Sequence, residues 1–162
     1  MHGFLAGLEA TGLSRWIRES TSVFAFPSIL TIHTIGMGFV AGLNAAVDLR
    51  ILGVAPAVPL LEMRRFFPFM WLAFWLNFVS GILLLIAYPT KALTNPLFYV
   101  KLAFIALAVV VLRRMREPVA RGDLGARARR LAVWSLVSWT GAITAGRFLA
   151  YTYKYLTASW LK

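Results

Sequence analysis

Residues 67–88, FPFMWLAFWLNFVSGILLLIAY, decide the fold of this chain, because the whole stretch contains no charged side chain. A helix needs about 20 mainly apolar residues to cross the ~30 Å hydrocarbon core of a bilayer. The stretch does not alternate in polarity as a barrel strand does, and lipid cannot satisfy an open strand edge. It therefore predicts a transmembrane α-helix.

The composition of the whole chain agrees with this prediction. Of the 162 residues, 60% are hydrophobic and 14% are charged, and the mean hydropathy is +0.74. Soluble domains are about 45–50% apolar and about 25% charged, so this class is excluded, and so is intrinsic disorder. Cysteine is absent, which excludes disulfides, thiolate metal sites, iron–sulfur clusters and covalently attached haem.

Apolar runs elsewhere in the chain predict an all-α fold, an integral membrane four-helix bundle. The expected spans are residues 23–47, 67–88, 97–115 and 131–153, within a domain of residues 23–162. Residues 1–22 carry apolar side chains at roughly helical spacing and predict an amphipathic helix on the membrane surface. Gly12 is the expected break in this helix.

The net charge of +11 is placed unevenly along the chain. Arginines concentrate in residues 48–66 and 113–130, between the expected spans. Positively charged loops remain in the cytoplasm, which predicts a multi-pass membrane protein with both termini on the outer side of the membrane. We expect membrane lipids as partners of these arginines, and no nucleic acid, because no RNA-binding or helix-turn-helix pattern is present.

His33 is an ionisable residue inside the first span. Such residues are costly in lipid, so each one suggests a function. One interpretation is an axial haem ligand, a metal ligand or a proton carrier. The other is a neutral imidazole that is hydrogen-bonded to a neighbouring helix through Asn77, Ser80 or Thr140. The second histidine of the chain is His2, so two histidines from one chain cannot sandwich a haem in mid-membrane.

Lys101 and Arg147 lie in the outer parts of the third and fourth spans. Both side chains can extend to the interface and meet lipid phosphates. Alternatively, together with His33 and Asn77 they form a cofactor-binding site, in which the two cations hold haem propionates, a quinone oxygen or a substrate carboxylate. Asp48 is interpreted as an anchor at the inner end of the first span, able to pair with an arginine of the long loop.

Small residues predict close helix packing. Gly38 and Gly42 form a G-x-x-x-G step, and Ala142 and Gly146 form a similar one. Such faces let helix backbones approach each other, within one bundle or between subunits.

Several of these residues also carry a family resemblance. The matching pieces are His33 with Gly36, the run Asp48-Leu49-Arg50-Ile51-Leu52-Gly53, Gly81, and Asn95-Pro96-x-Phe98-x-x-Lys101. Over residues 8–112 the chain resembles a family of small, uncharacterised four-helix inner-membrane proteins of bacteria, and it is more weakly similar to four-helix b-type cytochromes. Similar proteins often carry an acid at the position of Leu30, and a second histidine where this chain has Arg113 and Arg114. The resemblance implies a four-helix fold and a location in the bacterial inner membrane, where the outer side on which both termini are expected is the periplasm.

Three functions follow as expectations, in decreasing order of support. The first is a non-enzymatic accessory or structural subunit of a larger membrane complex, in contact with other membrane subunits or with copies of itself. The second is an electron-transfer subunit that binds haem b through His33. The third is a small-molecule transporter, for which few intramembrane polar groups are present. No phosphate-binding loop, dinucleotide fingerprint, zinc-protease motif or nucleophile elbow occurs.

Overall fold

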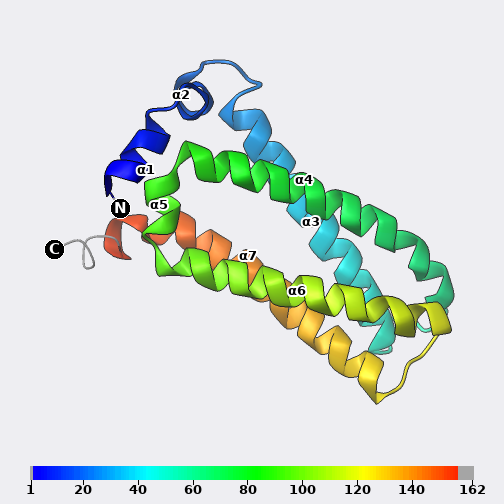
Figure 1. Ribbon diagram of the computed structural model, residues 1–162. Helices are drawn as coiled ribbons and strands as arrows, with labels where there is room; N and C mark the ends of the chain where they lie inside the picture. Colours follow the sequence, from blue (N-terminus) through cyan, green and yellow to red (C-terminus); the bar gives the residue numbers. More distant parts are fainter. Residues whose placement is uncertain (1, 157–162) are drawn as a thin grey trace.

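The computed structural model describes residues 2–156, and the side chains of 5–152 within them; residues 1 and 157–162 lie outside the described part. The described residues are all-helical and contain no strand (Figure 1). In chain order the elements are α1 (His2–Glu9), α2 (Gly12–Glu19), α3 (Phe26–Ile51), the 3-10 helix η1 (Leu60–Arg65), α4 (Phe66–Ala87), α5 (Pro89–Leu93), α6 (Pro96–Arg121) and α7 (Ala126–Leu156).

Three helical segments are long and apolar enough to cross a membrane: Phe26–Ile51, Leu60–Ala87 and Pro96–Arg121. The fourth expected span corresponds to α7, which has 31 residues but does not reach the same hydropathy within the described chain. Ser135, Ser138 and Arg147 lie in it, and these polar side chains lower its mean hydropathy.

Helices α3 and α6 run further than the apolar pattern predicts. The expected ends were residues 47 and 115, whereas the helices end at Ile51 and Arg121. The extensions carry arginines, whose long side chains reach water while the backbone stays helical. Gly122, at φ 66°, adopts the left-handed conformation that closes α6.

Residues 88–96 reverse the chain between α4 and α6. Pro89 begins the short helix α5, and Pro96 begins α6. Proline is favoured at the first turn of a helix because it has no amide hydrogen to leave unpaired. The Asn95 side chain caps α6 by accepting a hydrogen bond from the Leu97 amide at 3.0 Å, and Asn95 itself is fully buried.

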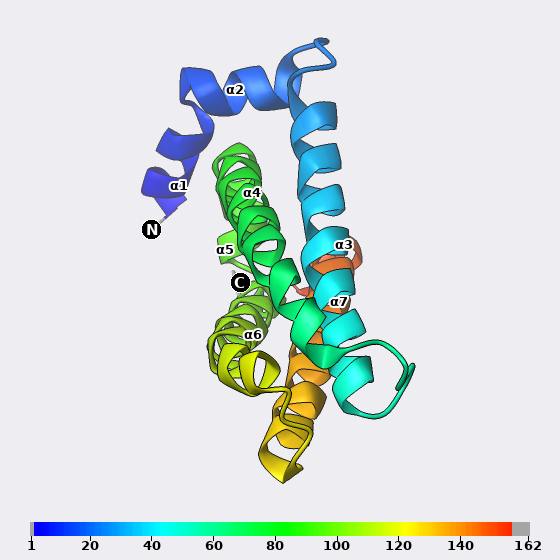
Figure 2. The same ribbon diagram turned by 90° about the vertical axis from the view of Figure 1, so that its right-hand side faces the viewer.

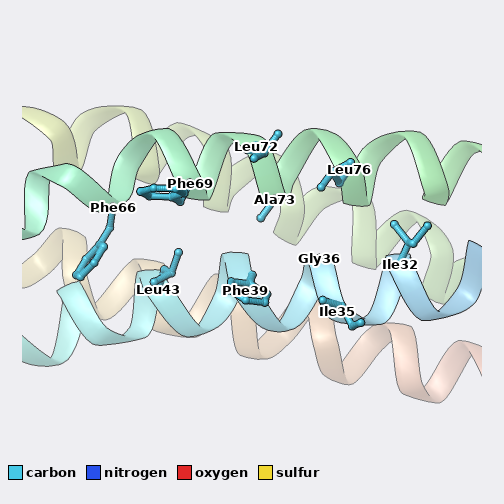
Figure 3. Close-up of a pocket in the computed structure, with 10 residues that line it drawn as sticks. All are labelled: Ile32, Ile35, Gly36, Phe39, Leu43, Phe66, Phe69, Leu72, Ala73 and Leu76. Atoms are coloured by element: carbon cyan, nitrogen blue, oxygen red, sulfur yellow. The ribbon is translucent and has the colours of Figure 1, made fainter.

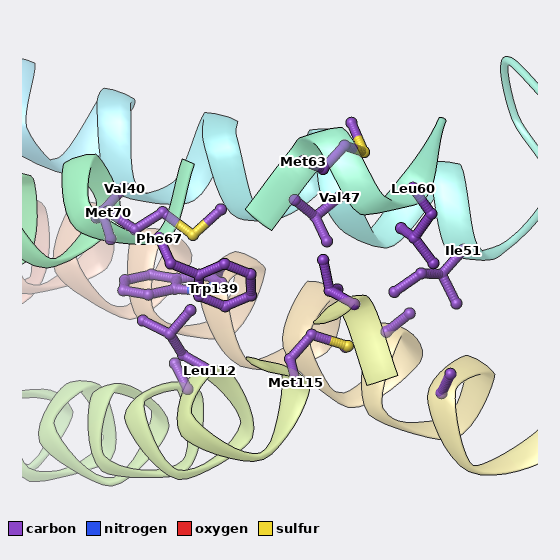
Figure 4. Close-up of a cluster of buried hydrophobic side chains, with 14 of the residues drawn as sticks. Val40, Val47, Ile51, Leu60, Met63, Phe67, Met70, Leu112, Met115 and Trp139 are labelled. Carbon is purple, nitrogen blue, oxygen red and sulfur yellow. The ribbon is translucent and has the colours of Figure 1, made fainter. Parts of the chain in front are cut away.

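The long helices pack in pairs, α3 with α4 and α6 with α7, and α3 and α7 join the two pairs (Figures 1 and 2). The main apolar core lies toward the end where η1 and the α6–α7 loop are found (Figure 4). Phe67 and Met70 of α4, Leu112 of α6 and Trp139 of α7 meet there, each 5% exposed or less. This core closes one end of the helix assembly.

The N-terminal segment packs against the opposite end. As expected, it is broken near Gly12, where α2 begins. Ile17 is fully buried and packs with Ile29 and Ala87, and the Ser14 hydroxyl donates to the main-chain carbonyl of Ala87 at 3.4 Å. Part of its apolar face therefore covers protein, whereas the sequence predicted that the segment lies on the membrane surface.

Candidate binding site

The His33 side chain of α3 is hydrogen-bonded to α4. Its Nδ1 lies 3.1 Å from the main-chain oxygen of Asn77 and 3.1 Å from the Ser80 hydroxyl. The Asn77 side-chain amide donates to the main-chain oxygen of His33 at 2.5 Å. Two of the three neighbours expected for a hydrogen-bonded imidazole, Asn77 and Ser80, are therefore in place, and Thr140 makes no such bond to His33 in the described part of the chain.

These contacts define which ring nitrogen carries the proton. A carbonyl oxygen can only accept, so Nδ1 of His33 donates to Asn77. The Ser80 hydroxyl donates to the carbonyl of Leu76 at 2.7 Å, which leaves its oxygen to accept from the ring as well. In the neutral imidazole, Nε2 then carries the free lone pair, and it has no hydrogen bond within the described residues.

Glycines make room for this arrangement. A side-chain carbon at Gly81 would lie 3.2 Å from Cε1 of His33, and one at Gly36 would lie 3.3 Å from the main-chain oxygen of Ala73. Gly36 thus permits α3 to approach α4, and Gly81 accommodates the imidazole.

A cavity of about 270 Å³ adjoins His33. Its walls come from α3, α4, α5, α6 and α7 and from the residue that joins α4 to α5. The lining residues are Phe26, Leu30, His33, Gly81, Leu84, Leu85, Tyr88, Lys91, Ala92, Phe98, Lys101, Gly146, Leu149 and Ala150. Most are apolar, and the ionisable ones are basic apart from the phenol of Tyr88.

The Lys101 side chain of α6 lines the cavity and lies against α7 at Gly146. A side-chain carbon at Gly146 would lie 3.6 Å from Cδ and Cε of Lys101 and 3.7 Å from its Nζ. The described part of the chain gives this ammonium no hydrogen-bond acceptor and no ion-pair partner.

The sequence-predicted site residues are only partly brought together. His33 and Lys101 line the same cavity, and Asn77 stands behind His33 and holds it. Arg147 is exposed and does not line the cavity. Lys91 and Tyr88 line it but were missed, because their position depends on how α5 turns back across the helix ends. Among the described residues, no group of three or more His, Cys, Asp or Glu side chains is suited to a metal ion.

A second polar cluster lies between α3 and α7. Asp48 is 1% exposed, the Ser135 side chain lies beside its carboxyl group, and its Oδ2 has no hydrogen-bond partner. The sequence suggested that an arginine of the long loop pairs with Asp48. Instead, Arg121 and Arg127 lie 3.0 and 3.6 Å from Glu117, and no ion pair with Asp48 occurs in the described chain.

An apolar groove of about 490 Å³ runs along the outer side of α3 and α4 (Figure 3). Phe39 of α3 and Phe69 of α4 contribute its aromatic walls, and both are about 60% exposed. Beside it, Gly38 and Gly42 border a shallower hollow, and a side-chain carbon at either glycine would meet no other atom within 4 Å. This face of α3 is therefore not used in packing within the chain.

In comparisons with known proteins, no family model, no curated protein and no solved structure matches this chain.

Proposed function

We propose that this protein is a multi-pass protein of the bacterial inner membrane, with α3, α4, α6 and α7 as its four transmembrane helices. The three apolar segments support this proposal, and so does the packing of α7 along α6 and α3. The arginine-rich ends of α6 and α7, on either side of the loop that joins them, would face the cytoplasm, and the end that carries α1, α2 and α5 would face the periplasm.

Within the membrane, we propose a non-enzymatic role as an accessory subunit. The observation that carries this proposal is the outer face of α3 and α4, where the groove of Figure 3 adjoins the unpacked glycines Gly38 and Gly42. The occupant to which we commit is a transmembrane helix of another membrane subunit. Lipid chains fill any apolar groove, whereas a helix gains additional close backbone contacts at a small-residue step.

Native electrophoresis of membranes in a mild detergent tests this role. The wild-type chain is expected to migrate in a complex larger than its own 18.1 kDa. Gly42→Leu would block the close approach and release the chain from the complex. Val133→Phe on α7 is the matched control, since Val133 is also exposed and apolar but does not line the groove. Migration of the wild-type chain as a monomer from native membranes would refute the proposal.

Haem b was the second candidate, and one observation favours it: Nδ1 of His33 donates to a main-chain carbonyl, as in many metal-binding histidines. The cavity beside His33 is too small for haem, however. The cavity of about 270 Å³ is below the ~300–1,000 Å³ of sites for drug-sized molecules, and haem is larger than most of these. We therefore expect protein from haem-replete cells to be colourless, and a Soret band in its absorption spectrum would reverse this conclusion.

A further inference from the structure

We propose that the His33–Lys101 cavity binds a compact, largely apolar monocarboxylate. This proposal goes beyond the accessory role and does not depend on it, because the cavity lies among the five helices and the groove lies on the outer side of α3 and α4.

The first argument is charge. Lys101 has no acceptor within the described chain, although it lies in a segment long and apolar enough to span a membrane. Lys91 lines the same cavity, and no Asp or Glu does. A cation at this depth requires a counter-charge, a water path or the interface. An anion held in the cavity would supply the counter-charge directly.

The second argument is the fixed imidazole. Asn77 and Ser80 engage Nδ1 of His33, so the ring is oriented before any ligand arrives. When the ring is protonated, Nε2 would donate a hydrogen bond to a carboxylate oxygen of the ligand. A site whose polar groups are already positioned loses less conformational entropy on binding.

The third argument is the size and character of the remaining walls. Phe26 and Phe98 face the cavity together with leucines and alanines, and Gly81 and Gly146 leave space beside the two basic groups. At about 30 Å³ for each water-sized group, 270 Å³ holds roughly nine non-hydrogen atoms. This matches one carboxyl group on a single ring or a short chain, and not a two-chain phospholipid.

Binding of 4-fluorobenzoate tests the proposal by ¹⁹F NMR on the purified full chain in phosphatidylcholine nanodiscs. The uncharged 4-fluorobenzamide, which has the same shape, is the matched ligand control. We expect saturable binding of the acid and a dissociation constant at least about tenfold weaker for the amide, as for loss of a charge-assisted hydrogen bond.

Variants connect this binding to the cavity. Lys101→Met is expected to weaken the acid's binding at least about tenfold, whereas Lys101→Arg, which retains the charge, is expected to preserve binding within a few-fold. Arg147→Gln is the control, because it removes a neighbouring cation that does not line the cavity. Circular dichroism and the elution volume of the discs establish that each variant is folded. Lack of acid binding, equal binding of acid and amide, or equal losses in Lys101→Met and Arg147→Gln would overturn the proposal.

Discussion

Asn77 and His33 bond to each other reciprocally across the α3–α4 interface. The Asn77 side chain donates to the main-chain carbonyl of His33 at 2.5 Å, and the His33 ring donates to the main-chain carbonyl of Asn77 at 3.1 Å. Each side chain is thus hydrogen-bonded to the main chain of the opposite helix. The register of the two helices is fixed at this level, where close contact at Gly36 also depends on it.

Removing the amide should loosen this helix pair. Asn77→Ala is expected to lower the free energy of unfolding by about 1 kcal/mol, the typical size of an interhelical hydrogen bond in membranes. Unfolding by sodium dodecyl sulfate in mixed micelles measures it. Thr34→Ala is the control, since the exposed Thr34 hydroxyl bonds only within α3, to Leu30. Equal stabilities of the two variants would show that the reciprocal bonds do not hold α3 to α4.

The glycines of α3 and α7 should differ sharply in their tolerance of a methyl group. A side-chain carbon at Gly141 would lie 2.7 Å from the Phe104 ring of α6, whereas one at Gly42 meets nothing within 4 Å. Gly141→Ala is expected to destabilise the protein by roughly 1–3 kcal/mol, as overpacking does. Gly42→Ala should be neutral or stabilising, because alanine favours the helix.

A second-site change checks the cause of that loss. If the methyl group at position 141 acts by displacing the Phe104 ring, then adding Phe104→Leu should recover part of the stability lost in Gly141→Ala. No recovery in the same detergent titration would place the cause elsewhere.

Neutralising Asp48 should stabilise the protein. Its carboxyl group is buried without a cationic partner in the described chain and has an unsatisfied oxygen. Asp48→Asn keeps the shape and the neighbouring Ser135 but removes the charge, so the free energy of unfolding should rise by about 1 kcal/mol or more. Asp123→Asn, in an exposed loop, should leave it within about 0.5 kcal/mol. A loss of stability in Asp48→Asn would mean that the carboxylate has a partner of its own.

The absence of cysteine makes the orientation in the membrane directly measurable. Leu124→Cys, in the α6–α7 loop, should be protected from a membrane-impermeant maleimide in intact spheroplasts and react after lysis. Leu13→Cys, on α2, should react without lysis. Both side chains are exposed, at 38% and 47%, so burial does not account for protection. The opposite labelling pattern would reverse the proposed topology.

Long apolar runs made the helices predictable, because lipid-length segments have few alternatives to a helix. The partners of His33 were also predictable, since Asn77 and Ser80 are polar residues of an otherwise apolar span. The cavity was not predictable from the sequence. Lys91 lines it because of the position of α5, and the spacing of apolar residues does not reveal that position. The burial of Ile17 was missed for a related reason: an amphipathic helix has the same pattern whether its apolar face meets lipid or protein.

The walls of the His33–Lys101 cavity are shared between the α3–α4 pair and the α6–α7 pair. A ligand bound there would contact both helix pairs at once and would therefore couple them. A ligand that binds only the folded protein raises its apparent stability. Protein purified without the ligand would therefore be less stable. The thermal unfolding temperature of the freshly purified protein would then fall as the bound ligand is washed out, although the polypeptide itself does not change.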